Sequence, residues 1–393
     1  MPSAKRLHRN SVIPDQGVDE LRHRRVVIKA GTSVLTKPPD HQGLNLKLMD
    51  DLVRQICDLR RLGSEPLLVT SGAIAAGREA LGSGHDDGLR DIPTRQVMAS
   101  VGQSRLMHTY QEMFASRGVQ VAQTLLTIGD LSDRQSYLNI RNTLQGLLEL
   151  EVVPILNEND VVAVDEIGEV FGDNDRLSAL VANLVDADLL VILTDIDGLY
   201  TADPHVDPEA RLIPQVDQVD ASVESLAGKN RKPWARGGMP TKLDAARLVT
   251  TSGISMVLCH GLANDAVLRA TRGEAVGTKF RPGAGKLEAR KRWMLSGISH
   301  WGEVIVDSGA SRALRESNRS LLPAGITEVK GEFRRGDIVY ITDQAGHHIA
   351  CGIANYRSED VARIRGSRSD KIQDALGYHY GQEVVHRDNL VVL

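Results

Sequence analysis

The chain contains 393 residues, which is long enough for two domains that each bury a hydrophobic core. Its apolar fraction of 41% and charged fraction of 25% are ordinary for a globular protein. A formal net charge of -4 excludes a global attraction to nucleic acid or to an anionic membrane surface.

The first 24 residues are polar and basic and lack the apolar stretch of a secretory signal, so we expect a disordered tail. No apolar run approaches the length of a membrane span, so we expect no membrane partner. The three cysteines, Cys57, Cys259 and Cys351, are far apart and form no C-x-x-C pair. This pattern predicts neither a disulfide framework nor a zinc site, and it favours a cytoplasmic location.

From Arg25 onward, short apolar runs alternate with segments of helical period. The predicted strands are 26–28, 66–69, 119–125, 152–156, 189–193 and 254–258. The predicted helices are 49–63, 94–116, 134–150 and 175–186. This alternation predicts an α/β fold, a three-layer αβα sandwich with a mainly parallel sheet. Within it, the pattern over 161–171 predicts a hairpin.

The pattern changes after a predicted linker at 284–299. Strand-like runs at 304–306, 338–342 and 349–354 are separated by turn signals, and only short helices at 310–316 and 358–364 interrupt them. We therefore expect a catalytic domain over 25–283 and a small β-barrel-like domain over 300–393.

Candidate site residues follow the predicted strands, because ligands of open α/β sheets bind at the carboxyl ends of the strands. These turns are Lys29–Ser33, Thr70–Ala73, Asn157–Asp160 and Thr194–Gly198, and Gly237–Lys242 later opens a helix. Glycine backbone amides and lysine side chains in this setting suit the phosphates of a nucleotide.

A second group of candidates, Asn157, Asp160 and Asn174, suits a substrate that carries an ammonium group and carboxylate oxygens. Taken alone, Thr70–Ala73 fits tight helix–strand packing, and Gly172–Asp175 fits a plain helix N-cap. Their convergence at one end of one sheet favours a ligand site.

Three other motifs are set aside. Gly283–Leu287 is similar to a P-loop, but Phe280 stands where the first glycine belongs and no Ser or Thr follows the lysine. Asp195–Gly198 lacks the remaining ligands of a calcium loop. His347 and His348 have no further metal ligand nearby in the predicted hairpin.

At the candidate turns the sequence resembles the glutamate 5-kinases of the amino acid kinase family. The matching stretches are 27–36, 69–77, 157–160, 172–175, 193–195, 198–204 and 237–242. The resemblance runs from about Arg25 to the end, because the C-terminal segment is similar to a PUA domain at 320–326 and 333–337.

The resemblance implies the amino acid kinase fold and ATP-dependent phosphorylation of the L-glutamate side-chain carboxylate, with Mg²⁺, as the first step of proline biosynthesis. It also implies proline as a feedback inhibitor and a homo-oligomer, either a dimer or a tetramer. The implied catalytic residues are Lys29 and Lys242, and Asp160 and its neighbours are expected to orient these lysines.

The resemblance also assigns binding residues. For glutamate they are Ser71, Gly72, Asn157, Asp160 and Asn174. For ATP they are Lys29, Gly31, Thr194, Asp195, Arg236, Gly237, Gly238, Met239, Thr241 and Lys242. We expect Mg²⁺ to take most of its ligands from phosphate oxygens and water rather than from the protein.

Two alternatives stay open. A kinase of the same fold acting on N-acetylglutamate, aspartate, carbamate or UMP would use the same turns. RNA binding is the alternative from another class, because PUA domains commonly bind RNA. From Trp301 to Leu393 there are 12 Lys and Arg but 13 Asp and Glu, so no basic excess favours RNA.

Overall fold

The computed structural model describes residues 21–37, 43–82, 92–163, 174–204, 206–226, 238–283, 298–317 and 319–393. Most of the expected tail and linker lie outside these residues, as do Arg236, Gly237 and most of the expected hairpin at 161–171.

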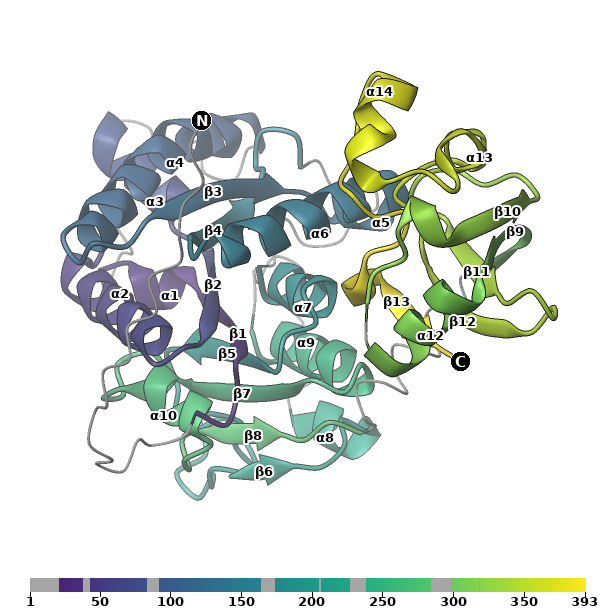
Figure 1. Cartoon of the computed structure of the whole chain (residues 1–393). Helices are drawn as coiled ribbons and strands as arrows, with labels where there is room; N and C mark the ends of the chain where they lie inside the picture. The colour runs from purple at the N-terminus through teal and green to yellow at the C-terminus, as the bar shows by residue number, and fades with distance from the viewer. Residues whose placement is uncertain are drawn as a thin grey trace, which may run out of the picture.

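The first and larger sheet has eight strands in the order β3-β4-β2-β1-β5-β7-β8-β6 (Figure 1). Its strands are β1 (Arg25–Ala30), β2 (Glu65–Thr70), β3 (Val121–Leu126), β4 (Val153–Glu158), β5 (Leu189–Thr194), β6 (Gln215–Val216), β7 (Ser255–His260) and β8 (Thr278–Phe280). All neighbouring strands are parallel except β7 and β8, which are antiparallel. The predicted, mainly parallel sheet is confirmed.

Helices cover both faces of this sheet, and each face has its own apolar core. One core joins the sheet to α1 (Thr32–Leu35), α2 (Leu46–Arg61), α3 (Ala73–Leu81), α4 (Ile92–Ala115) and α10 (Ala266–Arg272). The other joins it to α5 (Ile128–Ser132), α6 (Arg134–Glu149), α7 (Asn174–Leu184), α8 (Ala221–Leu226) and α9 (Met239–Thr251). The structure is therefore the expected three-layer αβα sandwich.

The alternation of side chains along β1 decides where its lysine points. Val26 and Ile28 belong to the core on the α2 side, whereas Val27 belongs to the core on the α7 side. Because successive residues of a strand face opposite sides of the sheet, Lys29 faces the same side as Val27. The strand thereby directs Lys29 toward α7.

The second sheet has five strands in the order β10-β9-β11-β12-β13 and its own buried core. The strands are β9 (Ile298–Val306), β10 (Ile326–Lys330), β11 (Ile338–Thr342), β12 (His348–Ile353) and β13 (Leu390–Val392). The helices are α12 (Ser308–Ser317), α13 (Ser358–Ile364) and α14 (Ile372–Leu376), with short 3₁₀ turns η2 (Pro323–Gly325), η3 (Ser369–Lys371) and η4 (Arg387–Asn389). In Figure 1 this part lies beside α5 and α6.

The six strands predicted for the larger sheet are all present, with ends shifted by no more than two residues. The prediction missed β6 and β8, which have two and three residues and are too short to show a strand period. No helix among the described residues is long and apolar enough to cross a membrane.

Candidate active site

A cavity of about 660 Å³ opens where β1, β2, β4 and β5 end. The turns that follow these strands line the cavity, together with the first residues of α7 and α9. The predicted residues found in its lining are Lys29, Gly31, Ser71, Gly72, Asn157, Asp160, Asn174, Thr194, Asp195, Gly238, Met239 and Lys242. Segments that are far apart in the sequence thus contribute to one cavity.

Asp175 connects the two predicted catalytic lysines. Its Oδ1 lies 2.5 Å from Nζ of Lys29, and its Oδ2 accepts a hydrogen bond of 3.2 Å from Nζ of Lys242. Oγ1 of Thr241 donates a further bond of 2.8 Å to Oδ2. All three charged side chains are buried, with Asp175 only 1% exposed. The carboxylate therefore offsets two ammonium groups that water reaches poorly.

The contacts with the two lysines change the pKa of Asp175. Burial raises the pKa of a carboxyl group, but the charges of Lys29 and Lys242 and the bonds from Lys29 and Thr241 outweigh burial. The net effect lowers the pKa of Asp175 well below its ordinary value. Asp175 is therefore ionised at neutral pH.

Each member of this cluster comes from a different element. β1 carries Lys29, the first turn of α7 carries Asp175, and the first turn of α9 carries Lys242. A carboxylate is favoured at a helix N-terminus because the helix dipole is positive there. Gly238 precedes α9 with a φ of 135°, which a residue with a Cβ rarely adopts. Its carbonyl oxygen lies 3.0 Å from Oγ1 of Thr241 and is the alternative acceptor to Asp175 for the one hydroxyl proton.

Asn174, the first residue of α7, joins the ends of β2 and β4. Its Nδ2 carries two hydrogens and lies within hydrogen-bond distance of three acceptors, the carbonyl oxygen of Thr70 and Oγ of Ser71, each at 2.8 Å, and Oδ1 of Asn157 at 3.1 Å. Because a carbonyl oxygen only accepts, the bond to Thr70 fixes which amide atom of Asn174 is the nitrogen. Oδ1 of Asn174 is buried, and no donor among the described residues reaches it. A ligand with an N–H group would satisfy this acceptor.

Asp160, Glu158 and Arg95 line the same cavity. Burial raises the pKa of Asp160 to about 6, and the positive charge of Arg95 opposes this shift. Burial lowers the pKa of Arg95, against the opposite effect of the charges of Asp160 and Glu158. A cationic group of a ligand would favour the ionised form of Asp160.

Among the charged residues that line the cavity, the sequence analysis assigned no role in the site to Asp175, Arg95, Arg78 or Glu158. Asp175 was interpreted only as a helix cap, and Asp160 was expected to orient the lysines. The structure gives that contact to Asp175. The segment Gly172–Asp175 was the available signal, but its spacing does not reveal which strand residue the carboxylate meets. Arg95 lies in a long helix outside every motif.

Three of the residues predicted to bind ATP are not placed in the cavity lining by the structure. Thr241 contacts Asp175 and does not line the cavity. Arg236 and Gly237 lie outside the described residues.

The described residues contain no group of three His, Cys, Asp or Glu side chains that could hold a metal ion. Asp175 is engaged by both lysines. The donor set therefore fits a divalent ion that arrives with a polyphosphate and keeps phosphate oxygens and water as its main ligands.

Comparison with known proteins shows which family this chain is similar to. Residues 24–260 match the amino acid kinase family, and residues 302–376 match the PUA domain. A glutamate 5-kinase from Dehalococcoides mccartyi (strain ATCC BAA-2266 / KCTC 15142 / 195) is 50% identical over 372 residues, which cover 94% of this chain and 99% of that protein. A glutamate 5-kinase from Herpetosiphon aurantiacus is 51% identical over 374 residues, covering 95% of this chain and all of that protein.

Among solved structures, a UMP kinase from Bacillus anthracis aligns with 67% of this chain and 97% of its own, at 17% identity and a TM-score of 0.47. This likeness is too low to support an inference about the site.

Replacing Asp175 with Asn should destabilise the fold, because it leaves two buried ammonium groups without their counter-charge. We expect the free energy of unfolding at neutral pH to fall by about 3 kcal/mol, measured by denaturant titration. Asp244→Asn is the matched control, since Asp244 is 59% exposed in its pair with Arg247 and its loss should cost less than about 1 kcal/mol. Equal losses in the two variants would contradict the role assigned to Asp175.

Proposed function

Because this chain belongs to the amino acid kinase family and, at 50% identity over nearly its whole length, to the glutamate 5-kinases, we propose that it transfers the γ-phosphoryl group of ATP to the side-chain carboxylate of L-glutamate. The product is L-glutamyl 5-phosphate, and the reaction is the first step of proline biosynthesis. The observation that carries this proposal is the pair of buried lysines held by Asp175 in one cavity with Asn174 and Ser71.

The nucleophile needs no general base. A glutamate side chain has a pKa of about 4.3, so at neutral pH its carboxylate is already ionised. A carboxylate oxygen forms a bond to the γ-phosphorus as the bond to the β–γ bridging oxygen breaks, and ADP leaves with that electron pair. The obstacle is the approach of one anion to another, which requires positive charge at fixed positions.

Lys29 and Lys242 supply that charge in our proposal. They face one cavity and share one carboxylate, so their ammonium groups are already in place when the substrates bind. Such preorganised groups stabilise charge on the transferring phosphoryl oxygens without rearranging during the reaction. Asp175 acts as a positioning residue, because each of its oxygens contacts one lysine.

Glutamate recognition is assigned to Ser71, Gly72, Asn157, Asp160 and Asn174. The buried Oδ1 of Asn174 and the carboxylate of Asp160 are two acceptors for an α-ammonium group. N-acetylation of the substrate would remove the positive charge that attracts the Asp160 carboxylate. These acceptors therefore favour glutamate over N-acetylglutamate.

ATP binding is assigned to the turns after β1 and β5 and to the start of α9. Gly31, Thr194, Asp195, Gly238 and Met239 line the cavity, which supports this assignment. Thr241 would act through Asp175, and Arg236 and Gly237 remain assigned by resemblance alone. When bound, Mg²⁺ would neutralise charge on the β- and γ-phosphates.

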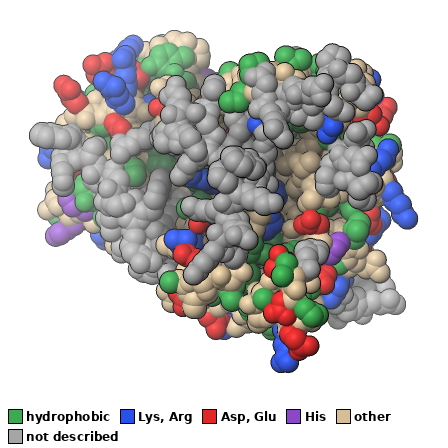
Figure 2. Space-filling view, turned by 180° about the vertical axis from the view of Figure 1, so that it is seen from behind, with side chains coloured by type: hydrophobic (Ala, Val, Ile, Leu, Met, Phe, Trp, Pro, Cys, Tyr) green, Lys and Arg blue, Asp and Glu red, His purple; other side chains and the backbone are tan. Residues whose placement is uncertain are grey.

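The C-terminal part has no basic excess, with 12 Lys and Arg against 13 Asp and Glu from Trp301 to Leu393, which does not favour RNA as its ligand. Figure 2 shows basic and acidic side chains interspersed on one face of the molecule. RNA binding requires a basic surface that engages several phosphates. We propose a structural or regulatory role for this part, with a catalytic domain over 25–283, a linker over 284–299 and a PUA domain over 300–393.

Three further features remain proposals that rest on the family resemblance. Proline is the expected feedback inhibitor, and the cytoplasm is the expected location. A dimer or tetramer is expected, and the exposed apolar side chains of Leu125, in the edge strand β3, and of Val97, in α4, support contact with a second copy.

Trapping of an acyl phosphate with hydroxylamine tests the reaction directly. With MgATP, we expect hydroxamate from glutamate and not from N-acetylglutamate or aspartate. Lys29→Ala and Lys242→Ala should each lower the rate by about 100-fold or more, because each removes a preorganised positive charge. Lys47→Ala is the control, since Lys47 is exposed on α2, outside the cavity. A folded protein that forms no hydroxamate from glutamate would refute the proposal.

The pH dependence of kcat/KM for glutamate tests the role of Asp160. Its pKa of about 6 means that the carboxyl group is neutral below pH 6 and ionised above it. Only the ionised form attracts the α-ammonium group, so kcat/KM should rise with pH and level off above about 6. Asp160→Asn should lower kcat/KM and abolish this inflection. An inflection near pH 6 that persists in Asp160→Asn would show that another group titrates.

A further inference from the structure

The C-terminal domain docks on helix α6 of the catalytic domain. Leu138 of α6 is fully buried in a small apolar cluster with Ile338, Cys351, Ile353 and Val391 of the second sheet. At the exposed edge of the contact, Nη1 of Arg335 donates a hydrogen bond of 2.5 Å to Oδ1 of Asn139. Side chains of α6 thus belong to the surface that holds the two sheets together.

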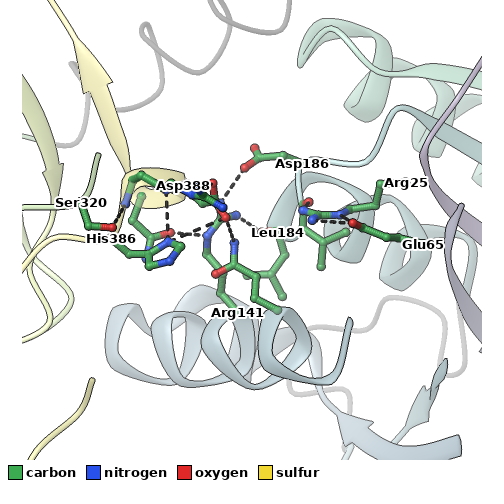
Figure 3. A network of polar contacts seen from close by, with 12 residues as sticks. Arg25, Glu65, Arg141, Leu184, Asp186, Ser320, His386 and Asp388 are labelled. Atoms are coloured by element: carbon green, nitrogen blue, oxygen red, sulfur yellow. Dashed lines mark hydrogen bonds and ion pairs between the residues drawn. The ribbon is translucent and has the colours of Figure 1, made fainter. Parts of the chain in front are cut away.

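Arg141 lies in the middle of this contact and is only 3% exposed. On the C-terminal side, its guanidinium donates to Oδ1 of Asn389 and to the carbonyl oxygen of Asp388. On the catalytic side, it donates to the carbonyl oxygen of Leu184 and to Oδ2 of Asp186 at 2.6 Å. Figure 3 shows the guanidinium between Asp388 on one side and Leu184 and Asp186 on the other.

The contact at Leu184 caps the C-terminal end of α7. The last carbonyl groups of a helix have no partner within the helix, and the helix dipole is negative at this end. The guanidinium supplies both a donor and a positive charge. Burial disfavours the charged guanidinium, but Asp186 and Asp388 outweigh burial and raise the pKa of Arg141. The cap is therefore charged at any physiological pH.

The other end of α7 carries the site. The helix has 11 residues and begins with Asn174 and Asp175, so its two ends are about 16 Å apart. A hydrogen-bonded helix transmits an axial shift from one end to the other with little internal deformation. A shift of α7 would therefore move the carboxylate of Asp175 relative to both lysines.

We propose that Arg141 is a positioning residue for the phosphoryl transfer. Through Arg141, the C-terminal domain holds α7 at the axial position in which Asp175 contacts both lysines. This inference rests on the proposed function, because the lysines matter only if they serve the transferring phosphoryl group. It assigns η4 of the C-terminal domain a role in catalysis although η4 does not line the active-site cavity.

A second contact at the end of α7 limits how much the loss of the Arg141 contact can slow the phosphoryl transfer. Nη1 of Arg25, in β1, donates to the carbonyl oxygen of Val185, so the catalytic domain also holds this end of the helix. Loss of the Arg141 contact should consequently loosen α7 without releasing it. We expect an effect within the two- to thirtyfold range that is typical of coupling between distant sites, about fivefold.

The experiment uses full-length Asn389 variants, which alter the C-terminal side of the contact and leave Arg141 and α7 intact. Asn389→Leu removes the acceptor but keeps the approximate shape, whereas Asn389→Asp keeps an acceptor. We expect kcat to fall about fivefold in Asn389→Leu with KM for ATP changed less than about twofold, because the lysines act mainly in the transition state. Asn389→Asp should restore most of kcat.

Asn139→Ala is the matched control, since it removes the hydrogen bond to Arg335 across the same contact without touching α7. Its kcat should equal that of the wild type. An equal loss of kcat in Asn139→Ala and Asn389→Leu would overturn the proposal, because it would assign the effect to docking in general. Wild-type kcat in Asn389→Leu would overturn it as well.

Hydrogen exchange separates this inference from the proposed reaction. Amides of α7 should exchange faster in Asn389→Leu than in the wild type or in Asn139→Ala, whatever reaction the protein catalyses. Unchanged exchange in α7 would contradict the coupling, whereas an inactive wild type would contradict only the proposed function. A melting temperature close to that of the wild type would exclude global unfolding as the cause of a loss.

Discussion

Two ammonium groups can be buried side by side at a phosphate-binding site only if a carboxylate lies between them. Asp175 meets this constraint by giving one oxygen to Lys29 and the other to Lys242. The rest of the site depends on this pair of contacts. The period of β1 turns Lys29 toward α7, the start of α7 places Asp175 at the strand ends, and the glycine before α9 allows Lys242 to approach.

Helix α7, which carries Asp175, connects the two lysines to more distant parts of the molecule. Its first turn carries a negative side chain. At its other end, the carbonyl groups of Leu184 and of Val185, the residue that follows the helix, accept from two arginines, so the charges at both ends complement the helix dipole. Of these two arginines, Arg141 also donates hydrogen bonds to the C-terminal domain. The C-terminal domain, whose described residues do not line the cavity, is thereby joined to the helix that carries Asp175.

Much of the fold could be predicted from the sequence because β1, β2, β4 and β5 show strong local signals. Each is a short apolar run followed by glycine, hydroxyl or amide residues, and parallel strands bring those turns to one edge. The features that could not be predicted depend on contacts between residues that are far apart in the sequence. Asp175 looks like an ordinary helix cap in the sequence, and its bond to Lys29 follows only from the packing of α7 on β1. The contact of Arg141 with Asn389 joins residues 248 positions apart and has no local signal.

A crystal structure of the protein with MgADP, aluminium fluoride and glutamate would test the central claim most directly. Aluminium fluoride mimics the transferring phosphoryl group between its donor and acceptor. We predict Nζ of both lysines within about 3 Å of the fluoride atoms. Each lysine should still contact Asp175, with the glutamate side-chain carboxylate opposite ADP. Either lysine turned away from the analogue, or glutamate bound with its side-chain carboxylate elsewhere, would contradict this account.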